Sequence, residues 1–249
     1  MNIEMPHQLW FTAFLNQYLA GPVSAMMSVL HVPNPHPRAP ISNYVAMEIL
    51  VFLLLVLFFI ATRISLSWDK PGVLQHIAEG MNNFVSNQGE EMIGHGYETY
   101  TSYIVTLGVF ILSMNLIGLI PGFEAPTAFP SVPLGCALVT WFFYHVHGLR
   151  ENGVIGYLKH FLGPVWWISP LLFVIEICSH FARIMSLTIR LYANMFAGDM
   201  VTLAFFSLVP LGFPVVFMGL HIFVSLIQTY IFITLAAVYL AEATAHGHD

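Results

Sequence analysis

The sequence predicts an all-α integral membrane protein with about five transmembrane helices and one amphipathic membrane-surface helix, in a single membrane domain over residues 1–249. Of its 249 residues, 57% are hydrophobic and 8% are charged, whereas soluble domains carry about 25% charged residues. Several apolar runs are long enough to cross a hydrocarbon core of about 30 Å. The few charges inside the last two runs recur at helical spacing.

The N-terminal part, residues 1–43, is predicted to form an interfacial segment and a loop ahead of a helical membrane core at 44–249. Residues 8–30 are moderately apolar and contain Gly21 and Pro22 in sequence. This composition favours an interfacial helix with a break at that pair. A proline-rich loop follows.

Three apolar runs predict membrane crossings at about residues 44–65, 100–120 and 132–147. The segment at 72–96, between the first two crossings, differs in kind. Its apolar residues recur at helical spacing, with amides and carboxylates at the other positions. This pattern predicts an amphipathic helix along the membrane surface or packed on other helices.

Two longer apolar segments complete the core. The first opens at Ser169 and Pro170, a signal typical of a helix start, and meets no further proline until Pro210. A helix over most of that range is about 60 Å long, twice the core thickness. It therefore either breaks near Gly198 or lies far more tilted than the usual ~20°. The last segment, at about 214–242, is about 42 Å long by the same rise, so both helices are predicted to be strongly tilted.

The basic residues predict how the chain is oriented. Arg63 follows the first crossing and Arg150 follows the third, whereas the loop after the second crossing has no basic residue. The positive-inside rule then places the N-terminus outside and, after five crossings, the C-terminus in the cytoplasm. Arg183 and Arg190 are left within the membrane.

Polar residues form a stripe on each long segment. On the first segment, five of them are separated by 4, 3, 7 and 4 residues, which places them on one helical face. They are Glu176, His180, Arg183, Arg190 and Asn194. On the last segment the separations are 4, 3, 11 and 3 residues. Its members are His221, Ser225, Gln228, Tyr239 and Glu242. Because a charge at the bilayer centre costs roughly 2.5–3.5 kcal/mol, two such stripes indicate a function.

The depths of these groups can be compared if the two segments are antiparallel neighbours. Aligning Gln228 with Arg190 places Asp199 near His221, both about 10–14 Å towards the outer side, and Glu176 about 21 Å towards the cytoplasm. Asp199 is about half a turn from Arg190 on a regular helix. We therefore expect it to reach the shared face only through a break or distortion of the helix.

Ionisable groups on both sides of a mid-membrane arginine predict a proton route. Carboxylates and histidine titrate when desolvated, whereas arginine keeps its proton. Arg190 is thus interpreted as a fixed counter-charge that blocks direct proton passage and attracts a carboxylate, which need not belong to this chain. The alternative is a packing role in which Arg190 pairs with Glu176 or Asp199. For His180 and Arg183, anchoring near the cytoplasmic interface is the alternative.

The sequence carries no motif for nucleotide, metal or nucleophilic chemistry. It has no G-x-x-x-x-G-K-[ST] loop, no H-E-x-x-H pair, no histidine cluster at ligand spacing and no basic run typical of nucleic-acid binding. We therefore expect a non-catalytic protein without cofactor, metal or nucleic acid. An independent secondary transporter is the alternative function, and it predicts two repeats with broken helices. A membrane enzyme with a histidine-based site is the weaker rival.

The stretches SLTIRLYANMFAGDM, HIFVSLIQTYIF and NLIGLIPGFEAPTA resemble subunit a of the rotary F-type ATP synthase, and the resemblance covers about residues 40–242. It implies a proton-translocating stator subunit of the membrane (Fo) sector, whose two long tilted helices face a rotating ring of c subunits. The implied partners are the c-subunit ring, the peripheral stalk b subunits, the remainder of the complex and the lipid bilayer. The expected location is the bacterial inner membrane. Whether H⁺ or Na⁺ is the coupling ion stays open, because that choice lies in the c subunit.

Matching positions in the family assign roles to single residues, all within 168–242. The resemblance makes Arg190 the essential arginine and Gln228 its partner on the last helix. Asp199 and His221 match an outer half-channel pair, and Asn194 faces the same route.

The cytoplasmic half-channel is matched by Glu176 and Ser179. One departure concerns the outer pair, because the family often has glutamate where this chain has the shorter Asp199. Another is Tyr192 followed by Ala193, where the family commonly has Phe-Gly.

Overall fold

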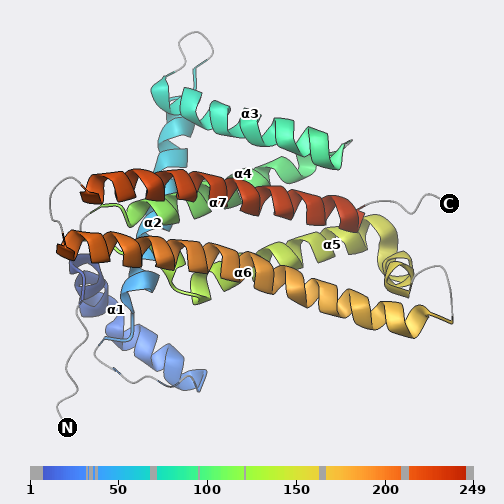
Figure 1. Ribbon diagram of the computed structural model, residues 1–249, viewed down its shortest axis with the longest axis horizontal. Helices are drawn as coiled ribbons and strands as arrows, with labels where there is room; N and C mark the ends of the chain where they lie inside the picture. The colour runs from blue at the N-terminus through green and yellow to red at the C-terminus, as the bar shows by residue number, and fades with distance from the viewer. Residues whose placement is uncertain are drawn as a thin grey trace.

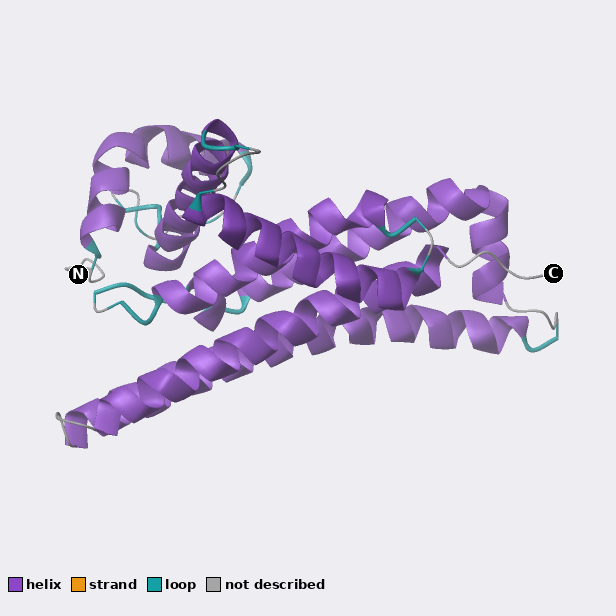
Figure 2. Cartoon of the chain, turned by 90° about the horizontal axis from the view of Figure 1, so that it is seen from above, coloured by secondary structure: helices purple, strands orange, loops and turns teal. Residues whose placement is uncertain are grey.

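The computed structural model describes residues 8–31, 33, 36, 39–67, 72–94, 96–120, 122–162, 167–208 and 213–244. Within these ranges it contains seven α-helices, one 3-10 turn and no strand (Figure 2). The helices are α1 (Trp10–Val29), α2 (Asn43–Ile64), α3 (Val73–Ile93), α4 (Glu98–Ile117), α5 (Ser131–Leu162), α6 (Ser169–Leu208) and α7 (Phe213–Thr244). Five of them, α2 and α4 to α7, are long and apolar enough to cross a membrane, which confirms the predicted class.

The two longest unkinked helices, α6 and α7, lie side by side along the long axis of the molecule, and α2 passes behind them at a steep angle (Figure 1). With 40 and 32 residues, they are about 60 and 48 Å long at 1.5 Å per residue. A core of about 30 Å needs only about 20 residues. Helix α2, with 22 residues, has the length of an upright crossing. We interpret the surplus length of α6 and α7 as a strong tilt, because both cross the direction of α2 at a steep angle (Figure 1).

The break predicted at Gly21 and Pro22 is wrong, and of the two alternatives given for the long segment, the break near Gly198 is absent. Helix α1 continues through Pro22, because one proline removes only a single ladder hydrogen bond. Helix α6 continues through Gly198, where the Thr202 hydroxyl donates to the glycine carbonyl at 2.8 Å. Helix α5 extends beyond the crossing predicted at 132–147 and kinks at Gly153, whose φ of 66° suits glycine.

The amphipathic helix predicted at 72–96 is α3, which packs on α4 and α7. Its polar Gln75 is buried, with its amide oxygen accepting from the Ser67 backbone N–H at 3.1 Å. Its apolar Ile77 and Phe84 are 44% and 52% exposed. Much of the apolar face of α3 therefore points away from this chain, as it does on a helix lying against lipid.

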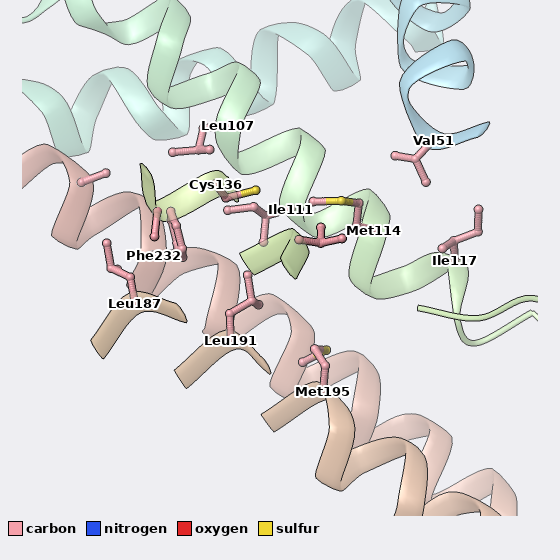
Figure 3. Packing of buried hydrophobic residues seen from close by; sticks show 13 residues of the cluster. Val51, Leu107, Ile111, Met114, Ile117, Cys136, Leu187, Leu191, Met195 and Phe232 are labelled. Carbon is pink, nitrogen blue, oxygen red and sulfur yellow. The ribbon is translucent and has the colours of Figure 1, made fainter. Parts of the chain in front are cut away.

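A dense apolar cluster fixes how α6 sits on its neighbours (Figure 3). Leu187, Leu191 and Met195, spaced four residues apart, form a ridge on α6 that is at most 3% exposed. Phe232 of α7 and Ile111 of α4 pack in the same cluster and are equally buried. Because lipid tails are as apolar as these side chains, the cluster is held by close packing and not by exclusion from water. The ridge determines which face of α6 meets α7.

The contact between α5 and the end of α7 has no room for a side chain at Gly148. A Cβ at that position would lie 2.6 Å from Cε2 of Tyr157 and 2.8 Å from the carbonyl oxygen of Ala243. The Ala243 oxygen belongs to the backbone, so it cannot move out of the way by a change of side-chain rotamer. We expect Gly148→Ala to destabilise the protein by about 1–3 kcal/mol, as overpacking does, measured by the thermal midpoint of the purified complex. Gly80→Ala is the control, because a Cβ there meets nothing within 4 Å. Equal midpoints for the two variants would contradict this account of the contact.

Candidate functional site

The polar stripe of α7 faces α6, as predicted. Ser225 and Gln228 are at most 2% exposed. The amide nitrogen of Asn194 on α6 donates to Oε1 of Gln228 at 2.7 Å. One turn away, the Ser225 hydroxyl points at the sulfur of Met195 at 3.9 Å. A polar contact is thus built into the middle of an apolar helix pair.

Arg190 lies on the flank of the apolar ridge and is half-buried. Its guanidinium donates to the Ser186 hydroxyl, one turn earlier on the same helix, at 3.2 Å. In the part of the chain that the structure describes, none of the ion pairs includes Arg190. The packing alternative paired Arg190 with Glu176 or Asp199, but each of these carboxylates pairs with a histidine instead.

Asp199 reaches α7 without any break in the helix, which corrects the expectation. Its Oδ1 lies 3.8 Å from Nδ1 of His221, whose side chain is 4% exposed. The face of α6 that meets α7 is centred on the apolar ridge and not on Arg190. Arg190 and Asp199 lie on opposite flanks of that ridge, so a regular helix delivers Asp199 to His221. Gly198 makes the approach possible, since a Cβ there would lie 2.8 Å from Nδ1 of His221.

A pocket of about 210 Å³ opens between α6 and α7 beside this pair. His221 and Asn194 line it together with Thr202, and its other walls are apolar. Since a water molecule occupies about 30 Å³ of liquid, the pocket has room for several. It joins the Asp199–His221 pair to the Asn194–Gln228 contact.

A second polar cluster lies towards the N-terminal end of α6. Oε1 of Glu176 is 3.3 Å from Nε2 of His180, and Nδ1 of His180 is 2.9 Å from the hydroxyl of Tyr144 on α5. The His145 ring lies 4.6 Å from that of His180. His180 thus has a hydrogen bond at Nδ1 and a carboxylate oxygen 3.3 Å from Nε2. Ser179 is half-buried beside the cluster and joins it through none of the hydrogen bonds found among the described residues.

Arg183 connects α6 to α7 in the same region. Its Nη2 donates to Oε1 of Glu242 at 2.9 Å, and its guanidinium carbon lies 4.8 Å from the ring centroid of Tyr239. This contact ties α6 to α7. Tyr144 has no counterpart among the residues singled out from the sequence. Helical periodicity relates residues of one helix only, and Tyr144 lies 36 positions before His180 on another.

The site thus has three parts along α6: a histidine–carboxylate pair at each end and an arginine between them. Arg190 is about 14 Å from Asp199 and about 21 Å from Glu176 along the helix axis. Across the described ranges no three histidine, cysteine, aspartate or glutamate side chains gather as metal ligands. The arrangement suits the binding and release of protons at two separate places.

The family model of the ATP synthase A chain matches residues 44–241. The ATP synthase subunit a of Solibacter usitatus is 48% identical over 233 residues, which cover 94% of this chain and 99% of that protein. The subunit a of Trichlorobacter lovleyi is 36% identical over 244 residues, covering 98% and 100% of the two chains. That of Geotalea uraniireducens is 40% identical over 200 residues, covering 80% and 86%.

The family model covers nearly the whole of the five candidate membrane spans, together with Glu176, His180, Asp199 and His221. These matches agree with the architecture of a multi-pass membrane protein with five candidate spans. This chain belongs to the family of ATP synthase subunit a, a component of the membrane sector of that complex.

Proposed function

We propose that this chain is the proton-translocating stator subunit of a rotary ATP synthase, with two offset half-channels separated by Arg190. The observation that carries the proposal is that Arg190 is in none of the ion pairs found among the described residues. It is a half-buried charge in a spanning helix, and the described carboxylates on either side of it are paired with histidines. Since an intramembrane charge costs roughly 2.5–3.5 kcal/mol, its counter-charge is expected from another chain. Each c subunit would bring one carboxylate.

In this proposal the outer half-channel contains Asp199 and His221, with Asn194 and Gln228 leading towards the c ring. A proton from the outer side would protonate the c-subunit carboxylate and release it from Arg190. The guanidinium keeps its own proton, so protons do not pass directly between the half-channels. Rotation of the ring is then the route from one half-channel to the other.

The inner half-channel would contain Glu176, Ser179 and the paired His180. A carboxylic acid on the ring would lose its proton there and return to Arg190 as a carboxylate. The Tyr144 hydroxyl both donates and accepts, so it satisfies Nδ1 of His180 whether that nitrogen carries a proton or not. This property suits a group that changes protonation state during turnover.

The surface beside Arg190 supports a partner that approaches closely. Ser186, Ala193 and Ala197 are small and exposed on the same side of α6. Small residues allow the backbones of membrane helices to come near each other. The length of α6 and α7 provides a broad surface for a ring. The rival secondary transporter predicted broken helices, whereas α6 and α7 are continuous.

The proposal extends to topology and partners. The single membrane domain of residues 1–249 would lie in the bacterial inner membrane with its N-terminus outside and its C-terminus in the cytoplasm, as the placement of Arg63 and Arg150 indicates. The c-subunit ring, the b subunits and the remaining subunits would be its partners. The chain itself would be non-catalytic, with ATP chemistry on those partners.

The direct test replaces Arg190 in the whole complex, reconstituted in vesicles. Arg190→Ala is expected to abolish ATP-driven proton pumping while passive leak persists or rises, because nothing then separates the half-channels. Arg190→Lys is expected to impair pumping as well, since an ammonium lacks the planar fork of donors. Fluorescent pH indicators report pumping and leak separately. Normal coupling in Arg190→Ala would refute the proposal.

The outer pair can be perturbed without removing either member. In Gly198→Ala the new Cβ would press on Nδ1 of His221 and displace the imidazole from Asp199. We expect pumping to slow several-fold with no rise in leak, because the arginine is intact. Gly219→Ala on α7 is the control, since its Cβ meets nothing within 4 Å. Equal pumping rates in the two variants would argue against a transport role for the pair.

The inner cluster is tested by His180→Gln and Tyr144→Phe. Both are expected to lower the proton flux and to change its dependence on cytoplasmic pH, because the protonatable ring or its support is altered. The dependence on outer pH is expected to stay unchanged. His147→Gln is the control, a histidine of α5 whose ring nitrogen bonds to the Phe143 carbonyl outside the cluster. A uniform loss of flux at every pH would indicate a purely structural role.

A further inference from the structure

A second isolated charge lies in the first membrane-spanning helix, far along the chain from the ion path. Glu48 is half-buried in the second turn of α2. It lines a pocket of about 460 Å³ between α2, α4 and α5. Val45, Leu107 and Phe110 contribute to the apolar walls of this pocket. The carboxylate is thus set into an otherwise largely apolar groove.

Glu48 differs from the carboxylates of the ion path. Glu176, Asp199 and Glu242 each lie within 4 Å of a histidine or arginine, at 3.3, 3.8 and 2.9 Å. Glu48 takes part in none of the ion pairs or side-chain hydrogen bonds found among the described residues. Carboxylates in spanning helices are costly and pair with a partner. The partner of Glu48 is therefore sought outside this chain.

The depth of Glu48 in the membrane distinguishes a lipid headgroup from a basic side chain as its partner. The 22 residues of α2 span about 33 Å, which matches a core of about 30 Å, so Asn43 lies near one boundary. Glu48 is five residues further on, about 8 Å inside the hydrocarbon. The ammonium group of a lipid headgroup lies outside that boundary. A lysine or arginine carried by a membrane helix can be placed at this depth.

The groove is open on the side that a helix would occupy. A Cβ built on Gly135 of α5 meets nothing within 4 Å, and Val139, one turn later, is 56% exposed. Leu107 and Phe110 of α4 form the floor. We propose that this groove between α2, α4 and α5 receives a membrane-spanning helix of another subunit, whose basic side chain forms an ion pair with Glu48. This groove is separate from Arg190, and the proposal does not depend on the proton path.

Photo-crosslinking in the purified complex locates the occupant. A photoreactive residue at Val139 is expected to capture one membrane-spanning helix of another subunit, within about one turn of a lysine or arginine, as read by peptide mass spectrometry. The control position is Leu57, which is 62% exposed and half a turn round α2 from Glu48. The helix captured at Val139 should be absent there. Lipid adducts alone at Val139, or a captured helix without a basic residue near the crosslink, would overturn the proposal.

Charge exchange tests the pairing itself. Glu48→Lys is expected to lower the Val139 crosslink yield at least about tenfold, because like charges then meet in a low-dielectric groove. Replacing the partner's basic residue with glutamate should restore the yield. Glu48→Gln, which keeps the shape of the side chain, is expected to give an intermediate yield. The amount of the chain in the membrane is measured in parallel to confirm that each variant folds. Unchanged yields in both Glu48 variants would refute the ion pair.

Discussion

The apolar ridge of Leu187, Leu191 and Met195 is the contact on which the rest of the site depends. It is packed against α4 and α7 and fixes the rotation of α6 about its own axis. One flank then presents Asp199 to His221, and the other holds Arg190. A rotation by one residue, about 100°, would turn Arg190 towards or away from the apolar core. The chemistry of the polar groups is thus set by neighbours that have no polar atoms.

Each charge in a spanning helix points to a partner, because an unpaired charge in the hydrocarbon core has a high free-energy cost. Three carboxylates of the spanning helices are paired within this chain. The pairs of Glu242 with Arg183 and of Asp199 with His221 join α6 to α7, whereas Glu176 pairs with His180 on the same helix. Arg190 and Glu48 have no ion-pair partner among the described residues. Both lie on surfaces that other subunits of a complex can reach. In the two proposals made above, Arg190 meets a carboxylate of another subunit during proton transfer, and Glu48 forms an ion pair that serves assembly.

The cost of exposing polar groups to lipid also explains why α6 and α7 are long and unbroken. A break in α6 or α7 would expose backbone groups to lipid, which is costly without a partner for them. An unbroken helix avoids that cost and has to tilt. The tilt spreads the polar groups over a wide strip of membrane. This separates the two histidine–carboxylate pairs while keeping both on one helix.

The sequence by itself determined the class, the approximate limits of the five crossings and the polar stripes, because apolar runs and helical spacing are properties of one helix at a time. The structure brings Asn194 to Gln228 and Asp199 to His221 across α6 and α7, two of the contacts that the stripes suggested. The sequence could not decide whether Asp199 reaches His221 on an unbroken helix. Nor could it show that the Tyr144 hydroxyl bonds to Nδ1 of His180. Both depend on how helices rotate and pack against one another. Only the tertiary structure decides the rotation of each helix, because that rotation depends on the volumes of the side chains where two helices meet. The periodicity within one segment contains no information about those contacts.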